Sequence, residues 1–281
     1  MTALPMPVVE PEQEPWPAFQ PITAWHHASG EWSQVNDRIA EEVAVALIYN
    51  GISHAVMLAP PTDLEDFALG FSLSEGLISN KSDLRDIEIV SSELGIELHL
   101  EIAPQAFYGF KVSRRQLAGR TGCGLCGQES LEQAIRPIPS VTRQLQITPA
   151  ILDRAMNQLP HLQALHQATG GVHAAAWADR QGTILLLRED VGRHNALDKL
   201  LGALFKRNLS PQDGFLLLTS RASHELVYKA AFAGIELLAA VSAPTSLALR
   251  HAQQAGLTLI GWVRKNGFSV YEGPQRLGYQ A

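Results

Sequence analysis

The chain has 281 residues, of which 46% are hydrophobic and 18% charged, with 22 basic and 28 acidic side chains. This balance is typical of a globular protein of one large or two small domains, and a net charge of −6 argues against binding nucleic acid over the whole surface. We expect no membrane association, because no apolar run approaches the ~20 residues that span a bilayer. The start of the chain lacks a secretory signal pattern and only two cysteines occur, which favours a cytoplasmic, reducing location.

Residues 1–36 are predicted to form an extended tail, because six prolines and several glutamates are concentrated in the first 21 residues. The tail also contains Trp16, Trp25 and Trp32. These side chains either dock the tail onto the body or form a partner-binding segment.

Residues 37–118 are predicted to form a β-rich subdomain that contains one helix. Asn50 and Gly51 lie between two apolar stretches, which is typical of a tight β-hairpin. Thr62 or Asp63 can cap the helix, which we expect to end near Gly76. The strands are expected over residues 41–50, 54–60 and 85–113, the last with a turn at Leu94-Gly95.

The second half of the chain begins with a predicted mobile loop and connector over residues 119–146, since residues 114–130 hold four glycines and few apolar side chains. Over residues 147–281, helical patterns alternate with continuous apolar strands. We therefore predict an α/β subdomain whose layered sheet has helices on both faces. We expect this subdomain to bind a cofactor. Strands are expected at 183–188, 214–219, 236–241 and 257–263, and helices at 148–159, 193–206, 223–233 and 245–254.

The strongest chemical signal is TGCGLCG at residues 121–127, where two residues separate Cys123 from Cys126. The glycines allow unusual backbone geometry, and nearby arginines favour the thiolate form, which is the nucleophile and metal ligand. The residues alone leave four interpretations open: half of a zinc site, a redox couple, a sulfur carrier, or two unreactive cysteines. A zinc site needs two further ligands, and no second cysteine pair exists.

The motif ATGGVHAAAW at residues 168–177 contains a glycine pair, Gly170 and Gly171, that suits close approach of an anion to a helix N-terminus. His173 resembles the first ligand of zinc deaminases, but alanine stands at position 175 in place of their essential glutamate. We therefore reject deaminase chemistry. The structural alternative is that His173 lines a core of small residues.

Two more motifs follow predicted strands. REDVGRHNALDKLLG at 188–202 offers Arg193, His194, Asn195 and Lys199 to phosphates or a purine, and TSRASHELVYKAAFAGI at 219–235 offers Arg221. In open α/β sheets the loops after such strands lie at one edge, where ligands bind. Each motif can also be explained as an ordinary helix cap.

Taken together, the ordered motifs from residue 40 to the C-terminus resemble the formate dehydrogenase accessory sulfurtransferase family, FdhD. The matching strings are GFSLSEGLI (70–78), TGCGLCG (121–127), TGGVHAAAW (169–177), REDVGRHNALDKLLG (188–202), SRASHELVYKAA (220–231), VSAPTSLA (241–248) and LTLIGWVR (257–264). The chain departs from the family at Trp262 and His224, where relatives often have phenylalanine, and at Ser269, where asparagine is frequent.

The resemblance implies a cytidine-deaminase-like fold, a homodimer, and a sulfurtransferase that takes persulfide sulfur from a cysteine desulfurase. The sulfur passes to the molybdenum of bis-molybdopterin guanine dinucleotide, bound as substrate with no permanent metal, on its way to the formate dehydrogenase catalytic subunit. Cys123 matches the family's persulfide cysteine, and Cys126 the second one. The family's cofactor-binding segment matches Trp262, Val263, Arg264, Lys265, Asn266 and Gly267. The alternatives are a cofactor chaperone without sulfur chemistry and a thiol redox or zinc-binding protein.

Overall fold

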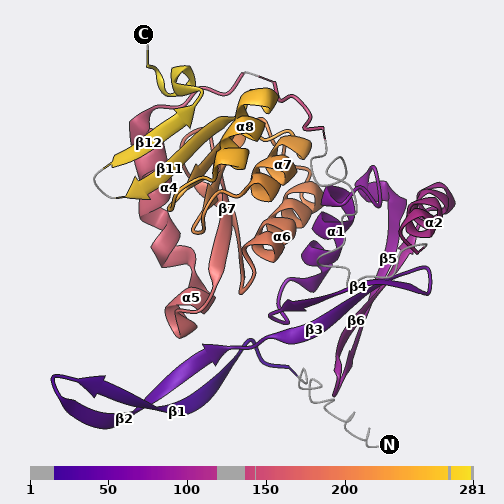
Figure 1. Ribbon diagram of the computed structural model, residues 1–281, viewed down its shortest axis with the longest axis horizontal. Coiled ribbons are helices and arrows are strands. Elements are labelled where there is room, and N and C mark those ends of the chain that lie inside the picture. The colour runs from indigo at the N-terminus through magenta and orange to yellow at the C-terminus, as the bar shows by residue number, and fades with distance from the viewer. Residues whose placement is uncertain (1–15, 119–136, 143, 265–266, 280–281) are drawn as a thin grey trace, which may run out of the picture.

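The computed structural model describes residues 16–118, 137–142, 144–264 and 267–279. These residues form two packed units and a projecting β-hairpin (Figure 1). The N-terminal unit contains a four-stranded sheet, and the C-terminal unit contains a six-stranded sheet. The predicted α/β class with a β-rich N-terminal part is therefore confirmed, whereas the cytidine-deaminase likeness stays a prediction.

The projecting hairpin pairs β1 (Phe19–Ala28) with β2 (Glu31–Ala40) in an antiparallel register. Its turn is formed by Ser29 and Gly30, both with positive φ, which matches the twist of a two-residue hairpin. The prediction of an extended tail up to residue 36 is wrong for this part. Almost all side chains of these two strands are exposed. Without a buried face, their sequence lacks the alternation of apolar and polar residues that predicts a strand. We call residues 19–40 the arm.

The N-terminal unit has the strand order β4-β3-β6-β5. Its strands are β3 (Val43–Tyr49), β4 (Ile52–Ala59), β5 (Leu84–Ser92) and β6 (Gly95–Ile102), with η1 (Lys81–Asp83) before β5. The Asn50-Gly51 turn, the turn before Gly95 and helix α1 (Leu64–Ser74) confirm the prediction.

A second helix, α2 (Pro104–Ala118), corrects the prediction of one helix in this unit. The alternating sequence pattern predicts strands up to residue 113 and a loop beyond it. Pro104 instead occupies the first helical position, where its missing N–H costs nothing. Phe107 and Phe110 then pack at helical spacing against the N-terminal core.

The C-terminal sheet has the order β12-β11-β10-β9-β7-β8. Its strands are β7 (His173–Asp179), β8 (Ile184–Asp190), β9 (Gly214–Leu218), β10 (Leu237–Ala240), β11 (Thr258–Arg264) and β12 (Gly267–Glu272). One face packs against α6 (Arg193–Lys206), α7 (His224–Phe232) and α8 (Ser246–Ala255). The other face packs against α4 (Pro149–Leu162), which leads into α5 (Ala164–Thr169), and the chain ends beyond η2 (Pro274–Leu277). The predicted cover of helices on both faces is confirmed.

The connector before α4 is packed, where the sequence predicted mobility. Leu145 is completely buried, and the Val141 N–H donates to the Ala255 carbonyl at 2.9 Å. The buried Glu236 carboxylate accepts hydrogen bonds from the backbone N–H groups of Gln144 and Leu145, both at 2.8 Å. The described residues from 137 to 146 therefore pack as part of the C-terminal unit. This packing corrects the prediction of a mobile connector for these residues.

The two units meet where α1 crosses α6. Gly70 and Gly202 let the helix backbones touch, because a Cβ at either position would lie 1.8 Å from a carbonyl oxygen of the other helix. Beside this contact, Asp198 of α6 is buried between Lys229 Nζ at 2.7 Å and Ser74 Oγ at 2.7 Å. Close packing and buried charge pairing thus join the halves firmly. No described helix is both long enough and apolar enough to cross a lipid bilayer.

Candidate functional site

The candidate site is the edge of the six-stranded sheet where β8, β9, β10 and β11 end. β9, β10 and β11 run parallel, and β8 shares their direction because β7 is antiparallel to both β8 and β9. The loops after these strands therefore meet at one edge, together with the start of β7. A short parallel bridge between Ala222 and Pro244 ties the loops after β9 and β10 together. The predicted convergence of loops at one edge is confirmed.

Buried charges support the corner of this edge where β8 leads into α6. Asp190 is fully buried at the end of β8, 2.7 Å from Lys199 Nζ, and accepts hydrogen bonds from Gly192 N–H at 2.8 Å and Asn195 Nδ2 at 3.1 Å. Burial raises the pKa of Asp190, and Lys199 opposes that rise. Lys199 and Asn195 are therefore buried supports, which corrects the expectation that they face phosphates. Sequence spacing could not show how deep they lie.

Arg193 and His194 begin α6, immediately after Gly192. This helix has no side-chain cap, so its first N–H groups are open to an anionic ligand. His194 Nε2 lies 3.3 Å from Glu225 Oε2 of α7. Burial lowers the pKa of His194 despite this carboxylate, so the imidazole is neutral at pH 7.

His173 starts β7 directly opposite Asp190 in the sheet. Burial, and then the positive charge of Arg193, lower the pKa of the half-buried His173. The structure therefore brings His173, Arg193 and His194 into one corner, as the sequence predicted. The result is a cationic guanidinium flanked by two neutral imidazoles, which can donate or accept hydrogen bonds without adding charge.

The loop from β9 to α7 places Arg221 at the same edge with its side chain exposed. Ser223 is the N-terminal cap residue of α7, but its hydroxyl makes no capping hydrogen bond. Within the described residues, this buried Oγ has no hydrogen-bond partner. The edge therefore offers a second uncapped helix start beside an exposed guanidinium, which suits anionic groups.

Trp262, at the end of β11, has a left-handed backbone with φ of 55° at a break in the register between β11 and β12. Its side chain is about half exposed, and the Arg264 guanidinium lies 6.0 Å from the ring centre. Such strain is often retained where a side chain is held for a purpose. Gly267 follows in β12, whereas Val263 is buried in the core and its side chain cannot reach a ligand, which corrects its predicted role.

Gly170 and Gly171 do reach this edge, but the predicted reason is wrong. Gly170 is the left-handed C-terminal cap of α5, and β7 follows, so the pair does not open a helix N-terminus. A glycine pair fits either role, and sequence alone did not distinguish them. Neither glycine has a side chain that could block access to His173.

Four predicted site residues lie outside the described residues: Cys123, Cys126, Lys265 and Asn266. The two cysteines fall between α2, in the N-terminal unit, and Pro137, where the described chain resumes in the C-terminal unit. Among the residues that the structure describes, no group of three or more histidine, cysteine, aspartate or glutamate side chains could hold a metal ion.

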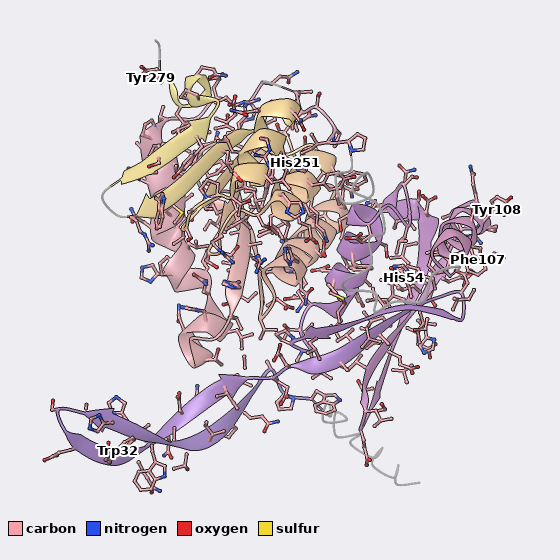
Figure 2. All side chains as sticks on the ribbon, viewed as in Figure 1. Trp32, His54, Phe107, Tyr108, His251 and Tyr279 are labelled. Atoms are coloured by element: carbon pink, nitrogen blue, oxygen red, sulfur yellow. The ribbon has the colours of Figure 1, made fainter. Side chains whose placement is uncertain are left out.

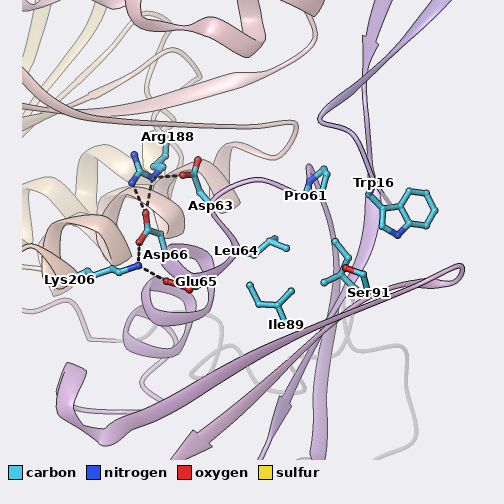
Figure 3. Close-up of a pocket in the computed structure, with 11 residues that line it drawn as sticks. Trp16, Pro61, Asp63, Leu64, Glu65, Asp66, Ile89, Ser91, Arg188 and Lys206 are labelled. Atoms are coloured by element: carbon cyan, nitrogen blue, oxygen red, sulfur yellow. Dashed lines mark hydrogen bonds and ion pairs between the residues drawn. The ribbon is translucent and has the colours of Figure 1, made fainter. Parts of the chain in front are cut away.

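A cavity with a volume of about 590 Å³ lies elsewhere, between the units (Figure 3). Its charged wall pairs internally: Arg188 contacts Asp66 at 2.5 Å and Asp63 at 3.2 Å, and Lys206 contacts Glu65 at 2.5 Å. Trp16, from the predicted tail, also lines it. Because these charges satisfy one another, the carboxyl edge of the sheet remains the better candidate site.

The fold and the edge together define a two-unit α/β protein that presents arginines, histidines and a tryptophan at the carboxyl ends of its strands. Residues 40–278 match the model of the FdhD/NarQ family, and the chain belongs to that family.

Similar proteins agree with this assignment. Proteins named sulfur carrier protein FdhD are 55% identical in Cupriavidus necator, covering 92% of this chain and 90% of the relative, and 52% identical in Bordetella petrii, covering 86% and 87%. A solved structure from Desulfotalea psychrophila, assigned as a formate dehydrogenase accessory protein, has a TM-score of 0.72. It is 23% identical and covers 93% of this chain and all of that chain, which supports the fold.

Proposed function

We propose that this protein is a sulfur carrier that receives sulfur on Cys123 and delivers it to a nucleotide-bearing molybdenum cofactor for formate dehydrogenase. The observation that carries the proposal is the similarity, at 50% identity or more, to proteins named sulfur carrier protein FdhD. The motif TGCGLCG supplies the thiol that such chemistry needs. The carboxyl edge of the sheet supplies a place for the acceptor.

In the loading step, the Cys123 thiolate attacks the outer sulfur of a persulfide on a cysteine desulfurase. A new sulfur–sulfur bond forms on Cys123, the bond within the donor persulfide breaks, and the donor leaves as a thiolate. No external oxidant or reductant is required, because the sulfane sulfur keeps its oxidation state.

In the proposed release step, the Cys126 thiolate attacks the inner sulfur of the Cys123 persulfide. A disulfide forms between the two cysteines, and hydrosulfide leaves with the electron pair, ready to bind molybdenum. A dithiol reductant must then restore both thiols. The alternative is that Cys126 only adjusts the pKa of Cys123. The variant Cys126→Ser distinguishes the two when it is loaded and the acceptor is then added, because in the release role the sulfur stays on Cys123 and in the pKa role it leaves.

We propose that the guanine dinucleotide groups of the cofactor bind at the carboxyl edge. Arg193 and Arg221 lie at uncapped helix starts, where pyrophosphate is favoured. Trp262 lies at the far end of the edge and offers an aromatic face to a base. β10 and β9 separate β11 from β7, a span of roughly 14 Å at ~4.8 Å per strand, which suits a long ligand.

The decisive measurement is intact-protein mass spectrometry after incubation with a cysteine desulfurase and cysteine. We expect the wild type to gain the mass of one sulfur atom, and Cys123→Ala to gain none. A wild type of unchanged mass, or a sulfur retained by Cys123→Ala, contradicts the role of Cys123.

Two rival functions give different results. A cofactor chaperone without sulfur chemistry predicts that Cys123→Ala still restores formate dehydrogenase activity to cells that lack this protein. A zinc-binding protein predicts stoichiometric zinc by elemental analysis. Titration with GDP by calorimetry tests the nucleotide edge separately, since a protein without that site gives no heat of binding.

The proposal also includes the cellular setting. The desulfurase and the formate dehydrogenase catalytic subunit are the proposed protein partners, the cytoplasm is the proposed location, and the protein is proposed to act as a homodimer.

A further inference from the structure

Arg193, in the first turn of α6, is a charged side chain that the chain leaves without an opposite charge. Within the described residues it makes no ion pair, and its buried Nε has no hydrogen-bond partner. Its place at the start of the helix adds a further cost, because the positive end of the helix dipole repels a cation. A partly buried guanidinium in this situation is explained if the site receives an anion.

The carboxylates at the end of β8 are committed to other groups. Asp190 lies 2.7 Å from Lys199 Nζ in the core. Glu189 accepts hydrogen bonds from two backbone N–H groups at the start of α5, both at 2.8 Å. These carboxylates therefore do not supply the negative charge that Arg193 lacks.

His194, the next residue of α6, is neutral at pH 7 without a ligand. Burial lowers its pKa most strongly, and the Glu225 carboxylate of α7, 3.3 Å from its Nε2, opposes that effect. Arg193 on its own helix, and Lys229 and His224 on α7, lower the pKa further. A second negative charge beside this imidazole would act together with Glu225 and favour the protonated form.

His173, at the start of β7, is subject to the same influences. Burial lowers its pKa, Arg193 and then His166 of α5 lower it further, and Asp190 of β8 opposes them. Because Asp190 is already paired with Lys199, its effect on this imidazole is the weakest of the four. Among the charged groups, Arg193 has the largest effect, so an anion that neutralises Arg193 would remove it.

An anion beside Arg193 would therefore act on both imidazoles in the same direction. An opposite charge within ~4–6 Å typically shifts a pKa by ~1–3 units toward the charged form. We propose that a phosphate group binds at this corner together with a proton, which the imidazoles of His173 and His194 take up from the solvent. The inference rests on the proposed nucleotide-binding role of the carboxyl edge. It adds that the site adjusts its own charge to that of the ligand.

Histidine suits this role better than a second arginine would. A permanent cation beside Arg193 would repel it in the ligand-free protein, whereas an imidazole acquires its charge only when the anion is present. By linkage, the proton and the phosphate must strengthen each other's binding by the same factor. The affinity for a nucleotide diphosphate should therefore rise as the pH falls.

The first test is calorimetric titration with GDP at pH 8 and at pH 6.5. A shift of ~1 pKa unit corresponds to a tenfold change in affinity, so we expect the wild type to bind about 3- to 10-fold more tightly at pH 6.5. The terminal phosphate of GDP also begins to take up protons near pH 6, which weakens binding and acts in the opposite direction.

Two variants assign the proton. In His173→Gln with His194→Gln, the side chains remain polar but cannot be protonated, so we expect the rise in affinity at low pH to disappear. The control His99→Gln removes an exposed imidazole in β6 of the N-terminal unit, which is 2.8 Å from Glu97. We expect this control to keep the pH dependence of the wild type.

The second test measures the histidines of the wild type directly, by NMR titration of protein with ¹³C-labelled imidazole rings. We expect saturating GDP to raise the pKa of His173 and His194 by about 1 unit or more. His54 and His99 serve as references in the same spectra, and Figure 2 shows His54 in the N-terminal unit. Their pKa values should not change. This test decides the question even if the double variant does not fold, which circular dichroism will show.

The outcomes separate this inference from the proposed function. If GDP binds but the affinity of the wild type does not change with pH, or neither imidazole responds, the proton coupling is wrong and the nucleotide site stands. A double variant that folds and keeps the full pH dependence also overturns the coupling. If GDP gives no heat of binding, both the site and the coupling fail. If sulfur loading of Cys123 fails while the pH dependence holds, the sulfur role fails and the coupling stands.

Discussion

Replacing Gly70 with alanine tests the contact that joins the two units. The new Cβ would lie 1.8 Å from the Asp198 carbonyl oxygen, whereas ordinary contact begins at about 3.4 Å. The helices must therefore move apart by about 1.6 Å. The clashing oxygen belongs to the backbone, so it cannot rotate away. When two surfaces separate by about 0.5–1 Å, each dispersion contact between them loses roughly a quarter to a half of its energy.

The expected cost can be set against the gain from helix propensity. Overpacking costs about 1–3 kcal/mol and sometimes more, and α1 must also separate from the buried Asp198–Lys229 pair. Alanine gains only ~0.5–1 kcal/mol over glycine in a helix. We therefore expect Gly70→Ala to lower the free energy of unfolding by about 3 kcal/mol, near the upper end of that range.

Gly109 provides a matched control, because it lies in helix α2 and a Cβ there would meet no atom within 4 Å. We expect Gly109→Ala to raise the free energy of unfolding by ~0.5–1 kcal/mol. Urea titration followed by circular dichroism measures both variants. If Gly70→Ala is as stable as Gly109→Ala, the backbone contact between α1 and α6 is not the one described.

Three other predictions concern the carboxyl edge. Lys199→Met leaves the buried Asp190 carboxylate without its partner, so we expect a loss of ~3–5 kcal/mol at pH 7. Burial already raises the pKa of Asp190, so protonation relieves that loss, and urea titrations should show a smaller deficit at pH 5 than at pH 7. Burial lowers the pKa of His173 and His194 in the folded state, so stability should decline as pH falls below 6.5, and a double His→Gln variant should show a shallower decline. Trp262→Ala should weaken GDP binding about 5- to 150-fold by calorimetry if the indole stacks on the base, and unchanged affinity contradicts that role.

The parts of the fold that were predictable have local signals. Asn50 and Gly51 both take the positive φ that their turn requires, and this chemistry is visible in two letters of sequence. Continuous apolar strands separated by helices predicted a covered sheet. The edge followed from topology, because parallel strands end on one side wherever the chain folds in this way.

The parts that were missed depend on tertiary distance. Lys199 lies nine residues after Asp190, and no pattern on the helix shows that their side chains meet in the core. The arm lacks a buried face, so its alternation of side chains gave no amphipathic signal. Gly70 and Gly202 had one available signal, since a glycine inside a helix often marks close packing, but the sequence could not pair them with each other.

The buried charges between the units also limit how a sulfur carrier of this fold can move. Opening a hinge between α1 and α6 would separate Asp198 from Ser74 and expose or orphan groups that are buried together with Lys229. Breaking such a buried network costs ~3–5 kcal/mol, which leaves the open form below about 1% of molecules at equilibrium. A carrier must meet first a sulfur donor and then an acceptor, and a population that small would slow both encounters. The movement that transfer requires is therefore expected outside the α1–α6 contact, and the two units should act as one rigid support for the edge that holds the acceptor.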